Sequence, residues 1–177
     1  CRRRSRAGFS SSTISIFIGT SGLRVLERES QAHGVPAALI GNGQVAKIIC
    51  SYPRSAHSKV FPELYRAGKI ELELVPQGTL AERIRAGGAG IPAFYTATTV
   101  HTPLAEGKEL RTFDGRDYVM EYALKADFAI IKAEKADRLG NLTYNKTARN
   151  FNPIMATAAK NTIVQARTLV SVGDINP

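Results

Sequence analysis

The chain has 177 residues, of which 44% are hydrophobic and 22% charged, so it is long enough for one domain with a sizeable core. No segment approaches the roughly 18 consecutive apolar residues of a membrane span. Two cysteines, Cys1 and Cys50, cannot form a disulfide framework, and no Cys/His spacing suggests zinc. We therefore predict a single domain from 1 to 177, with no metal site, no membrane association and a reducing compartment.

The net charge of +9 does not indicate nucleic-acid binding. Five arginines precede the first acidic residue, Glu27, and the remaining charges of both signs are mixed along the chain. A nucleic-acid interface would show a basic stripe interleaved with aromatic residues, which is missing here. We predict no nucleic-acid partner, although a modest positive field suits a ligand that carries phosphates.

The first elements are harder to assign than the later ones. Residues 1–14 are rich in Arg and Ser and contain no acidic residue, a composition typical of a transit peptide, of a truncated gene product or of a misread 5′ end. We expect this segment to be disordered or a non-native extension. The protein is then cytoplasmic or, alternatively, located in the mitochondrial matrix. Residues 15–18 predict a short strand that enters a turn between Gly19 and Gly22, and 34–40 favour a helix.

From residue 45 onward, strand and helix patterns alternate regularly. Asp114-Gly115 between two alternating segments, 110–113 and 117–122, predicts a hairpin. Asn152 followed by Pro153 predicts a capped helix start. The other predicted strands cover 45–50, 70–75, 91–95, 128–132, 142–144 and 163–165, and the other helices 58–67 and 80–86. The alternation predicts an α/β domain with a mostly parallel sheet.

Residues 75–96 are the most informative segment. Residues 70–74 alternate in polarity as a half-buried strand does, and Pro76-Gln77-Gly78 ends this strand. Thr79 and Glu82 form a capping-box pattern, which predicts a helix beginning at Leu80. Gly87 and Gly88 fall where a left-handed helix stop is expected. Gln77 thus lies at a strand end before a helix N-terminus, where an anion or oxyanion is favoured.

Several separate segments resemble, in the same order, the first (A, or alpha) subunit of the family I coenzyme A transferases, the 3-oxoacid and 3-oxoadipate CoA-transferases. They cover residues 47–54, 64–73, 75–96, 126–129, 137–142 and 148–153. The resemblance extends from about Val45 to the C-terminus, and it implies the three-layer α/β/α fold of that family.

The resemblance also implies roles for individual residues. Gln77 matches a glutamine whose amide stabilises the oxyanion formed when the acyl carbonyl is attacked. Gly19 and Gly22 match the outer positions of a glycine loop that contacts CoA, with Thr20 and Ser21 departing from the pattern. Gly88 and Gly90 either let CoA or a partner approach the backbone or serve as a helix end with tight packing.

Other parts of the family pattern are altered. The family usually continues Pro-Thr-Gly-x-Gly-Thr where this chain has residues 97–102, so two glycines are replaced. His101 in this segment is expected to be a loop residue and not a base, because no Ser, Cys or Asp constellation frames it. The chain is also shorter than the family pattern between Gly22 and Val45.

The glutamate nucleophile of the family has no counterpart, since the Ser-Glu-Asn-Gly segment that carries it in the second (B) subunit does not occur. The resemblance therefore implies a first subunit that binds CoA as a substrate, with no permanently bound cofactor. It would transfer CoA from succinyl-CoA to 3-oxoadipate or acetoacetate together with the second subunit, in a heterodimer or heterotetramer. The alternatives are a catalytically inactive remnant that acts only as a binding partner, and a sugar-phosphate isomerase-like domain of related fold.

Overall fold

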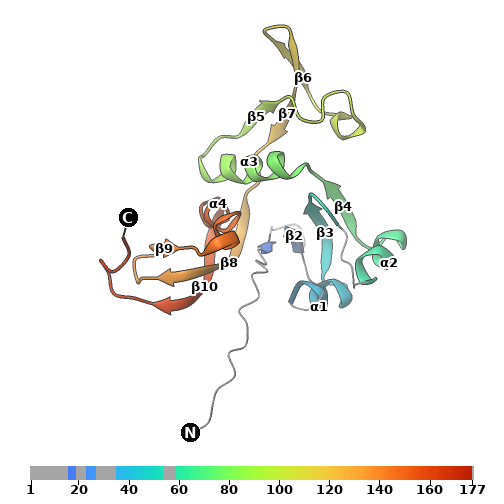
Figure 1. Ribbon diagram of the computed structural model, residues 1–177. Helices are drawn as coiled ribbons and strands as arrows, with labels where there is room; N and C mark the ends of the chain where they lie inside the picture. Colours follow the sequence, from blue (N-terminus) through green and yellow to red (C-terminus); the bar gives the residue numbers. More distant parts are fainter. Residues whose placement is uncertain (1–15, 19–22, 27–34, 54–58, 177) are drawn as a thin grey trace.

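The computed structural model describes residues 16–18, 23–26, 35–53 and 59–176. Its strands are divided among three small sheets (Figure 1). The α/β class predicted from the sequence is confirmed, but the described strands are not collected in one sheet. The type of connection sets the direction in which neighbouring strands pair. Helical crossovers impose parallel pairing, and short turns impose antiparallel pairing.

The first sheet is parallel and has the order β2 (Leu23–Leu26), β3 (Val45–Cys50), β4 (Glu71–Leu74). Helix α1 (Val35–Gly41) precedes β3, and α2 (Val60–Arg66) connects β3 to β4. Strand β3 is buried on both faces, with Ile48 3% and Ile49 4% exposed. Ile48 belongs to a cluster with Ile40 and Ile70, and Ile49 belongs to the central core. Burial of both faces is expected of a central parallel strand.

The alternation of β4 is less regular than its sequence suggests. Ile70 is buried, but Leu74 is 41% exposed, and Glu73 is half-buried. The prediction that all the apolar residues of this strand share one buried face is therefore wrong at Leu74. Its neighbour Glu73 is held half-buried by Lys47 of β3 and by Arg83.

The second sheet is antiparallel and has the order β5 (Ala93–Thr96), β7 (Arg116–Tyr122), β6 (Leu110–Phe113). Asp114 and Gly115 have φ values of 50° and 74°, as a two-residue hairpin turn of type I′ requires, so the predicted hairpin is confirmed. The short helix η1 (Pro103–Ala105) lies between β5 and β6. Figure 1 shows this sheet rising from the rest of the molecule as an arm.

The third sheet has the order β1 (Ile16–Ile18), β8 (Ala126–Ala136), β10 (Ala159–Leu169), and β9 (Leu142–Thr143) also pairs with β8. β8 and β10 are parallel, and the other pairs are antiparallel. The short helix η2 (Lys146–Arg149) precedes α4 (Asn152–Ala158), which packs on β8. Asn152 does not cap this helix, because its side chain instead binds Ala148 O (2.6 Å) and Lys132 N (3.2 Å).

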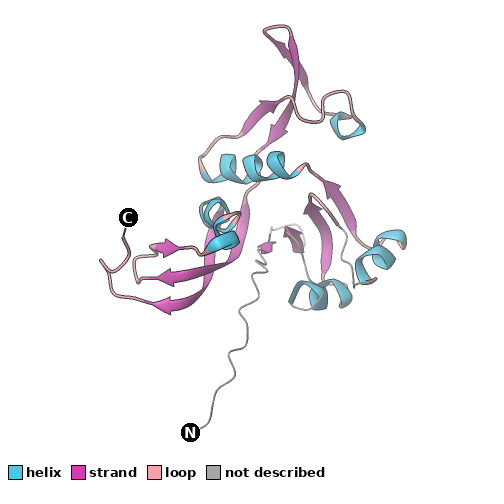
Figure 2. Cartoon of the chain, in the orientation of Figure 1, coloured by secondary structure: helices cyan, strands magenta, loops and turns pink. Residues whose placement is uncertain are grey.

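Helix α3 (Gln77–Gly88) lies between the arm and the two lower sheets (Figure 2). Its buried side chains, Leu80 and Ile84, join the central core with Ile131 of β8 and Met155 of α4. Ile84, Ile131 and Met155 are fully buried. None of the helices in the described ranges is long and apolar enough to cross a membrane.

Candidate functional site

The candidate site begins at the C-terminal ends of β3 and β4. The backbone N–H of Val75 donates to the Cys50 carbonyl oxygen at 3.0 Å, which holds the end of β4 against β3. Pro76 then turns the chain with φ −53° and ψ 140°, and α3 begins at Gln77. Parallel α/β sheets place their ligands at this edge, beyond the carboxyl ends of the strands. The prediction that Gln77 lies at the strand end is therefore confirmed.

The first turn of α3 is open on its outer side. Gln77 and Gly78 are exposed, and a Cβ added to Gly78 would meet no atom within 4 Å. This turn contains no acidic residue, so no carboxylate of its own opposes the positive end of the helix dipole. Backbone N–H groups at a helix N-terminus favour an anion or a developing oxyanion. The arrangement suits an amide that stabilises negative charge, and the catalytic role of Gln77 stays a prediction.

The capping box predicted from Thr79 and Glu82 is wrong. The Leu80 N–H donates to the Pro76 carbonyl at 2.8 Å, so the first helical turn closes three residues earlier than predicted. Thr79 lies inside the helix, and its buried hydroxyl has no hydrogen-bond partner within the described part of the chain. Glu82 binds Arg85 at 2.6 Å instead. Gln77 is consequently the first residue of the helix and not a residue of the preceding turn.

The helix stop predicted at Gly87 and Gly88 is also wrong, because both residues are helical. The left-handed residue is Gly90, with φ 75°, and the Ile91 N–H donates to the Ala86 carbonyl at 3.0 Å. This six-to-one bond around a left-handed glycine is a Schellman motif. Gly90 is exposed with open space where a Cβ would stand, so the predicted approach of a ligand to it is sterically possible.

At Gly88 the space beside the backbone is occupied by another part of this chain and not left open for a ligand. A Cβ there would lie 2.3 Å from Thr157 Oγ1 on α4, and one on Gly87 would lie 2.3 Å from the Leu124 carbonyl oxygen. The packing interpretation therefore accounts for both glycines. Contact of Gly88 with CoA stays a prediction. Gly19 and Gly22, the other two predicted CoA contacts, lie outside the described residues.

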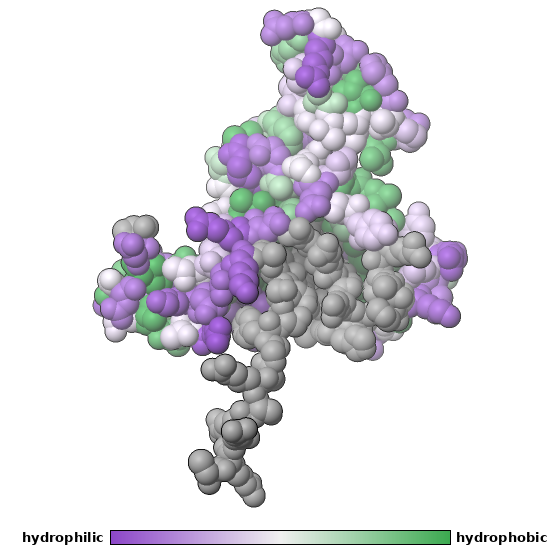
Figure 3. Space-filling model, viewed as in Figure 1, coloured by the Kyte–Doolittle hydropathy of each residue, from purple (hydrophilic) through white to green (hydrophobic). Residues whose placement is uncertain are grey.

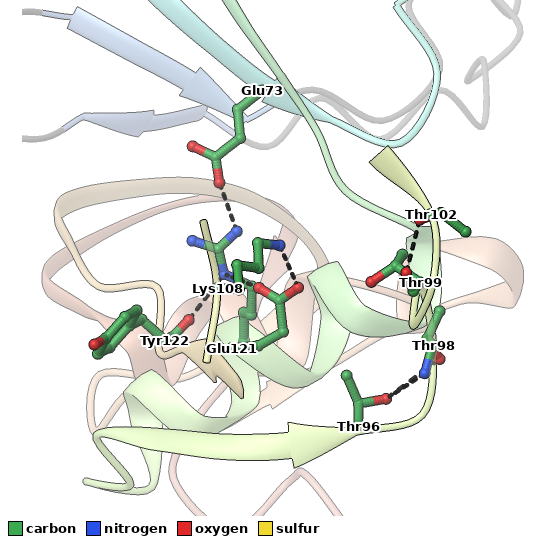
Figure 4. Close-up of polar contacts among 9 residues, drawn as sticks. Glu73, Thr96, Thr98, Thr99, Thr102, Lys108, Glu121 and Tyr122 are labelled. Atoms are coloured by element: carbon green, nitrogen blue, oxygen red, sulfur yellow. Dashed lines mark hydrogen bonds and ion pairs between the residues drawn. The ribbon is translucent and has the colours of Figure 1, made fainter. Parts of the chain in front are cut away.

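A cluster of charged side chains joins α3 to the sheets on either side of it. Arg83, 9% exposed, donates from Nε to the Tyr122 carbonyl oxygen (2.8 Å) at the end of β7 and from Nη1 to Glu73 Oε1 (2.7 Å) on β4 (Figure 4). Its Nε also lies 3.9 Å from Glu121 Oε2, and Glu121 is 2% exposed. One guanidinium thus connects the parallel sheet with the arm.

A lysine completes each end of this cluster. Lys47 Nζ lies 2.8 Å from Glu73 Oε2, and Lys108 Nζ lies 2.6 Å from Glu121 Oε1. Burial raises the pKa of Glu73, but the hydrogen bonds from Arg83 and Lys47 outweigh burial and hold that pKa below its ordinary value. The sequence analysis did not identify this cluster. One sequence signal could have identified it: Arg83 falls three residues after Leu80, on the face of the helix that is buried.

The loop that follows β5 contains Thr99 and His101, where the resemblance noted in the sequence implies glycines. Thr99 and His101 have φ values of 74° and 59°, in the left-handed region that favours glycine. Hydrogen bonds between Thr102 and the Thr99 carbonyl hold this turn (Figure 4). The imidazole of His101 lies 3.2 Å from Asp117 Oδ2, so the expectation that no Asp stands beside it is wrong. Both side chains are exposed, as in an ion pair at the surface of a loop. The backbone has kept a conformation that glycine adopts without strain.

The comparisons with known proteins decide the family. The chain matches the coenzyme A transferase family over residues 11–177. The protein belongs to that family. It is 62% identical over 141 residues to the first (A) subunit of 3-oxoadipate CoA-transferase from Pseudomonas putida, a match that covers 80% of this chain and 61% of the relative. It is 57% identical over 139 residues to the corresponding subunit of a probable succinyl-CoA:3-ketoacid coenzyme A transferase from Bacillus subtilis (78% of this chain, 58% of the relative).

A solved structure of this coenzyme A transferase fold is also similar to the chain. It is an acyl-CoA transferase of Escherichia coli O157:H7 in a thioester complex with CoA, with a TM-score of 0.70 and 22% identity over 82% of this chain and 33% of that one. At this identity the likeness supports the fold. The chain spans about 60% of the length of the two first-subunit relatives described above.

Proposed function

We propose that this chain is the single-domain first (A) subunit of a CoA transferase, which moves CoA from succinyl-CoA to a 3-oxoacid. The observation that carries the proposal is the 62% identity over 141 residues to the first subunit of 3-oxoadipate CoA-transferase from Pseudomonas putida. The acceptor is 3-oxoadipate or acetoacetate, since relatives with both kinds of name match the chain at similar identity.

In this proposal Gln77 stabilises the oxyanion that forms when the acyl carbonyl of the thioester is attacked. Its exposed position in the first turn of α3 supports this role, because the helix dipole and nearby backbone N–H groups favour negative charge at that point. Preorganised neutral donors of this kind contribute about 10²–10³ in rate. The open space beside Gly78 leaves room for a substrate group to approach the helix end.

The nucleophile comes from the second (B) subunit. A carboxylate there attacks the acyl carbon of succinyl-CoA and expels the CoA thiolate, which leaves a mixed anhydride on the enzyme. The thiolate then attacks the enzyme's own carboxyl carbon in that anhydride, which forms an enzyme thioester and releases succinate. The 3-oxoacid receives CoA from that thioester. The two buried carboxylates of the described residues do not offer this chemistry, because Glu121 is engaged by Lys108 and Asp137 accepts hydrogen bonds from Leu139 and Asn141.

The test is reconstitution with the second subunit of the Pseudomonas putida 3-oxoadipate CoA-transferase. The chain alone should transfer no CoA from succinyl-CoA to either acceptor, and the complex should form 3-oxoadipyl-CoA or acetoacetyl-CoA. Turnover by the isolated chain would overturn the division of the site between two subunits. A stable complex without turnover would identify the chain as an inactive binding partner. Failure to form any complex would overturn the proposal as a whole.

A further inference from the structure

The two faces of the β5–β7–β6 sheet differ in what they contact. On one face Val119 is fully buried and Glu121 is 2% exposed, with Glu121 directed towards Arg83 of α3. The other face points away from α3, because side chains alternate along a strand. It carries the side chains that we call the aromatic face: Tyr95, Phe113, Arg116, Tyr118, Met120 and Tyr122.

Strand pairing places these side chains side by side. Tyr95 lies opposite Met120, and Phe113 lies opposite Arg116. The rings of Tyr95 and Phe113 meet edge to face at 5.3 Å, and those of Phe113 and Tyr118 at 5.6 Å. Tyr122 is nevertheless 64% exposed and Phe113 40%. The aromatic rings are ordered against one another and remain open to solvent on the outside of the arm, which stands clear of the body of the molecule (Figure 3).

The composition of this face is that of a protein interface. Tyr, Phe, Met and Arg are enriched at the centres of protein–protein interfaces, and Tyr and Arg dominate binding hot spots. A solvent-facing antiparallel sheet usually carries polar residues on its outer side. Ordered aromatic side chains also lose little conformational entropy when a partner covers them, which favours binding.

The charges on the aromatic face indicate which kind of partner fits. Arg116 lies over the Tyr118 ring (5.8 Å to the centroid), and no carboxylate of the described residues forms an ion pair with it. Neighbouring Arg111 lies over the Tyr95 ring and binds Glu109, which also accepts a hydrogen bond from the Tyr95 hydroxyl. A second copy of this chain, docked face to face about a two-fold axis, would bring the same surface of both copies together, and this surface has a net positive charge because Arg111 and Arg116 outnumber Glu109. A different protein with apolar side chains and a carboxylate opposite Arg116 avoids this repulsion.

We propose that the aromatic face is the surface on which the second (B) subunit docks. This inference rests on the proposed function. It assigns to the arm the role of holding the partner, while the first turn of α3 supplies the donor for the reaction. The two are joined rigidly, because Arg83 of α3 binds the end of β7, the strand that carries most of the aromatic face.

The experiment measures the affinity of the full chain for the second subunit of the Pseudomonas putida 3-oxoadipate CoA-transferase. The face variant combines Arg116→Glu with Tyr122→Ser. The control combines Arg138→Glu with Tyr65→Ser, since both control residues are exposed and lie outside the arm. We expect at least a tenfold rise in Kd for the face variant and less than a twofold change for the control. Thermal unfolding of both variants checks that they are folded.

A second measurement needs no substitution. Hydrogen exchange of the wild-type chain should slow in residues 110–122 when the second subunit is added. If that subunit binds, but the face variant binds equally well and residues 110–122 gain no protection, the docking surface is elsewhere and only this inference fails. If the wild-type chain self-associates and the face variant is monomeric, the occupant is a second copy and the inference is also overturned. Absence of any binding by the second subunit overturns both the proposed function and this inference.

Discussion

The parallel sheet β2–β3–β4 and the antiparallel sheet β5–β7–β6 differ in where they expose side chains that could bind a ligand or a partner. Strand β3 is buried on both faces, and Gln77 lies beyond the C-terminal end of its neighbour β4. Strand β7 is buried on one face only, and its other face presents aromatic side chains to solvent. Helical crossovers cover parallel sheets and leave ligand sites at the strand ends, whereas hairpins leave a whole face free for a partner.

Helix α3 connects these two regions. Its first turn belongs to the end of the parallel sheet, and Arg83 in its middle binds both Glu73 of that sheet and the last carbonyl of β7. The comparison therefore predicts that the strongest effects come from residues that hold α3 in place. Substitutions in the arm alone should be milder.

The largest effect is expected for Arg83→Met, which removes the guanidinium between Glu73 and Glu121. Breaking a buried ion pair costs about 3–5 kcal/mol, and we expect about 3 kcal/mol because Lys47 and Lys108 remain. The control, Arg85→Met, removes an exposed guanidinium paired with Glu82 and should leave stability nearly unchanged, because solvent screens such a pair. Urea unfolding measures both variants. Equal stability of the two would show that Arg83 does not link the sheets.

The next effect concerns the end of the parallel sheet. In the complex with the second subunit, Gln77→Ala should lower kcat by about 10²-fold with little change in KM, since the amide acts on the developing oxyanion. Gln165→Ala on β10 is the matched control for loss of an exposed amide and should leave kcat unchanged. A kcat for Gln77→Ala equal to that of wild type would reduce Gln77 to a surface residue of the helix.

A third prediction separates the two ends of α3. Gly88→Ala should destabilise the protein by about 1–3 kcal/mol, because its Cβ would overlap Thr157, whose hydroxyl is held by the Ile154 carbonyl. Gly78→Ala meets no atom and should change stability by less than about 1 kcal/mol, in the stabilising direction, because Ala favours a helix. Thermal unfolding of the two variants compares them directly. The opposite ranking would contradict the packing of α3 on α4.

The pKa of Glu73 predicts the pH dependence of the link between the sheets. Its pKa lies below the ordinary value of 4.5, so the folded state favours the charged carboxylate. This contribution to stability is fully present above pH 4.5 and is lost as the pH falls through the lower, folded-state pKa. Stability of the wild type should therefore fall more steeply between pH 5 and pH 3 than that of Glu73→Gln. Parallel curves would show that Glu73 titrates normally.

The smallest effect is expected in the arm, at Thr99. A β-branched residue at φ 74° is strained by about 1–3 kcal/mol, and Thr99→Gly should relieve this strain. The greater entropy of glycine in the unfolded chain offsets part of the gain, which leaves a net stabilisation of about 1 kcal/mol. Val100→Gly, at a neighbouring position without a positive φ, should instead destabilise. Calorimetric melting of both variants tests the signs, and a lower Tm for Thr99→Gly would contradict the strain.

Local patterns in the sequence determined the elements whose geometry depends on a few adjacent residues. The predicted strand at 45–50 agrees with β3, and the Asp114-Gly115 turn has the two positive φ values that its type requires. The location of Gln77 beyond a strand end followed from the same kind of local pattern, although the helix begins at Gln77 and not at Leu80 as predicted. The family also followed from the sequence, because separate segments matched it in order.

Only the tertiary structure decided the features that depend on contacts between distant residues. Thr79 is buried inside α3, and so does not serve as its cap, because the turn closes on Pro76 and that face of the helix packs inward. Leu124 and Thr157 occupy the space beside Gly87 and Gly88, so these glycines allow close packing within the helix and do not end it. Arg83 reaches Glu73 and Tyr122, which are 10 and 39 residues away. Periodicity reports which residues prefer burial, but the partner that a buried charge or a glycine meets is chosen by the packing of other elements.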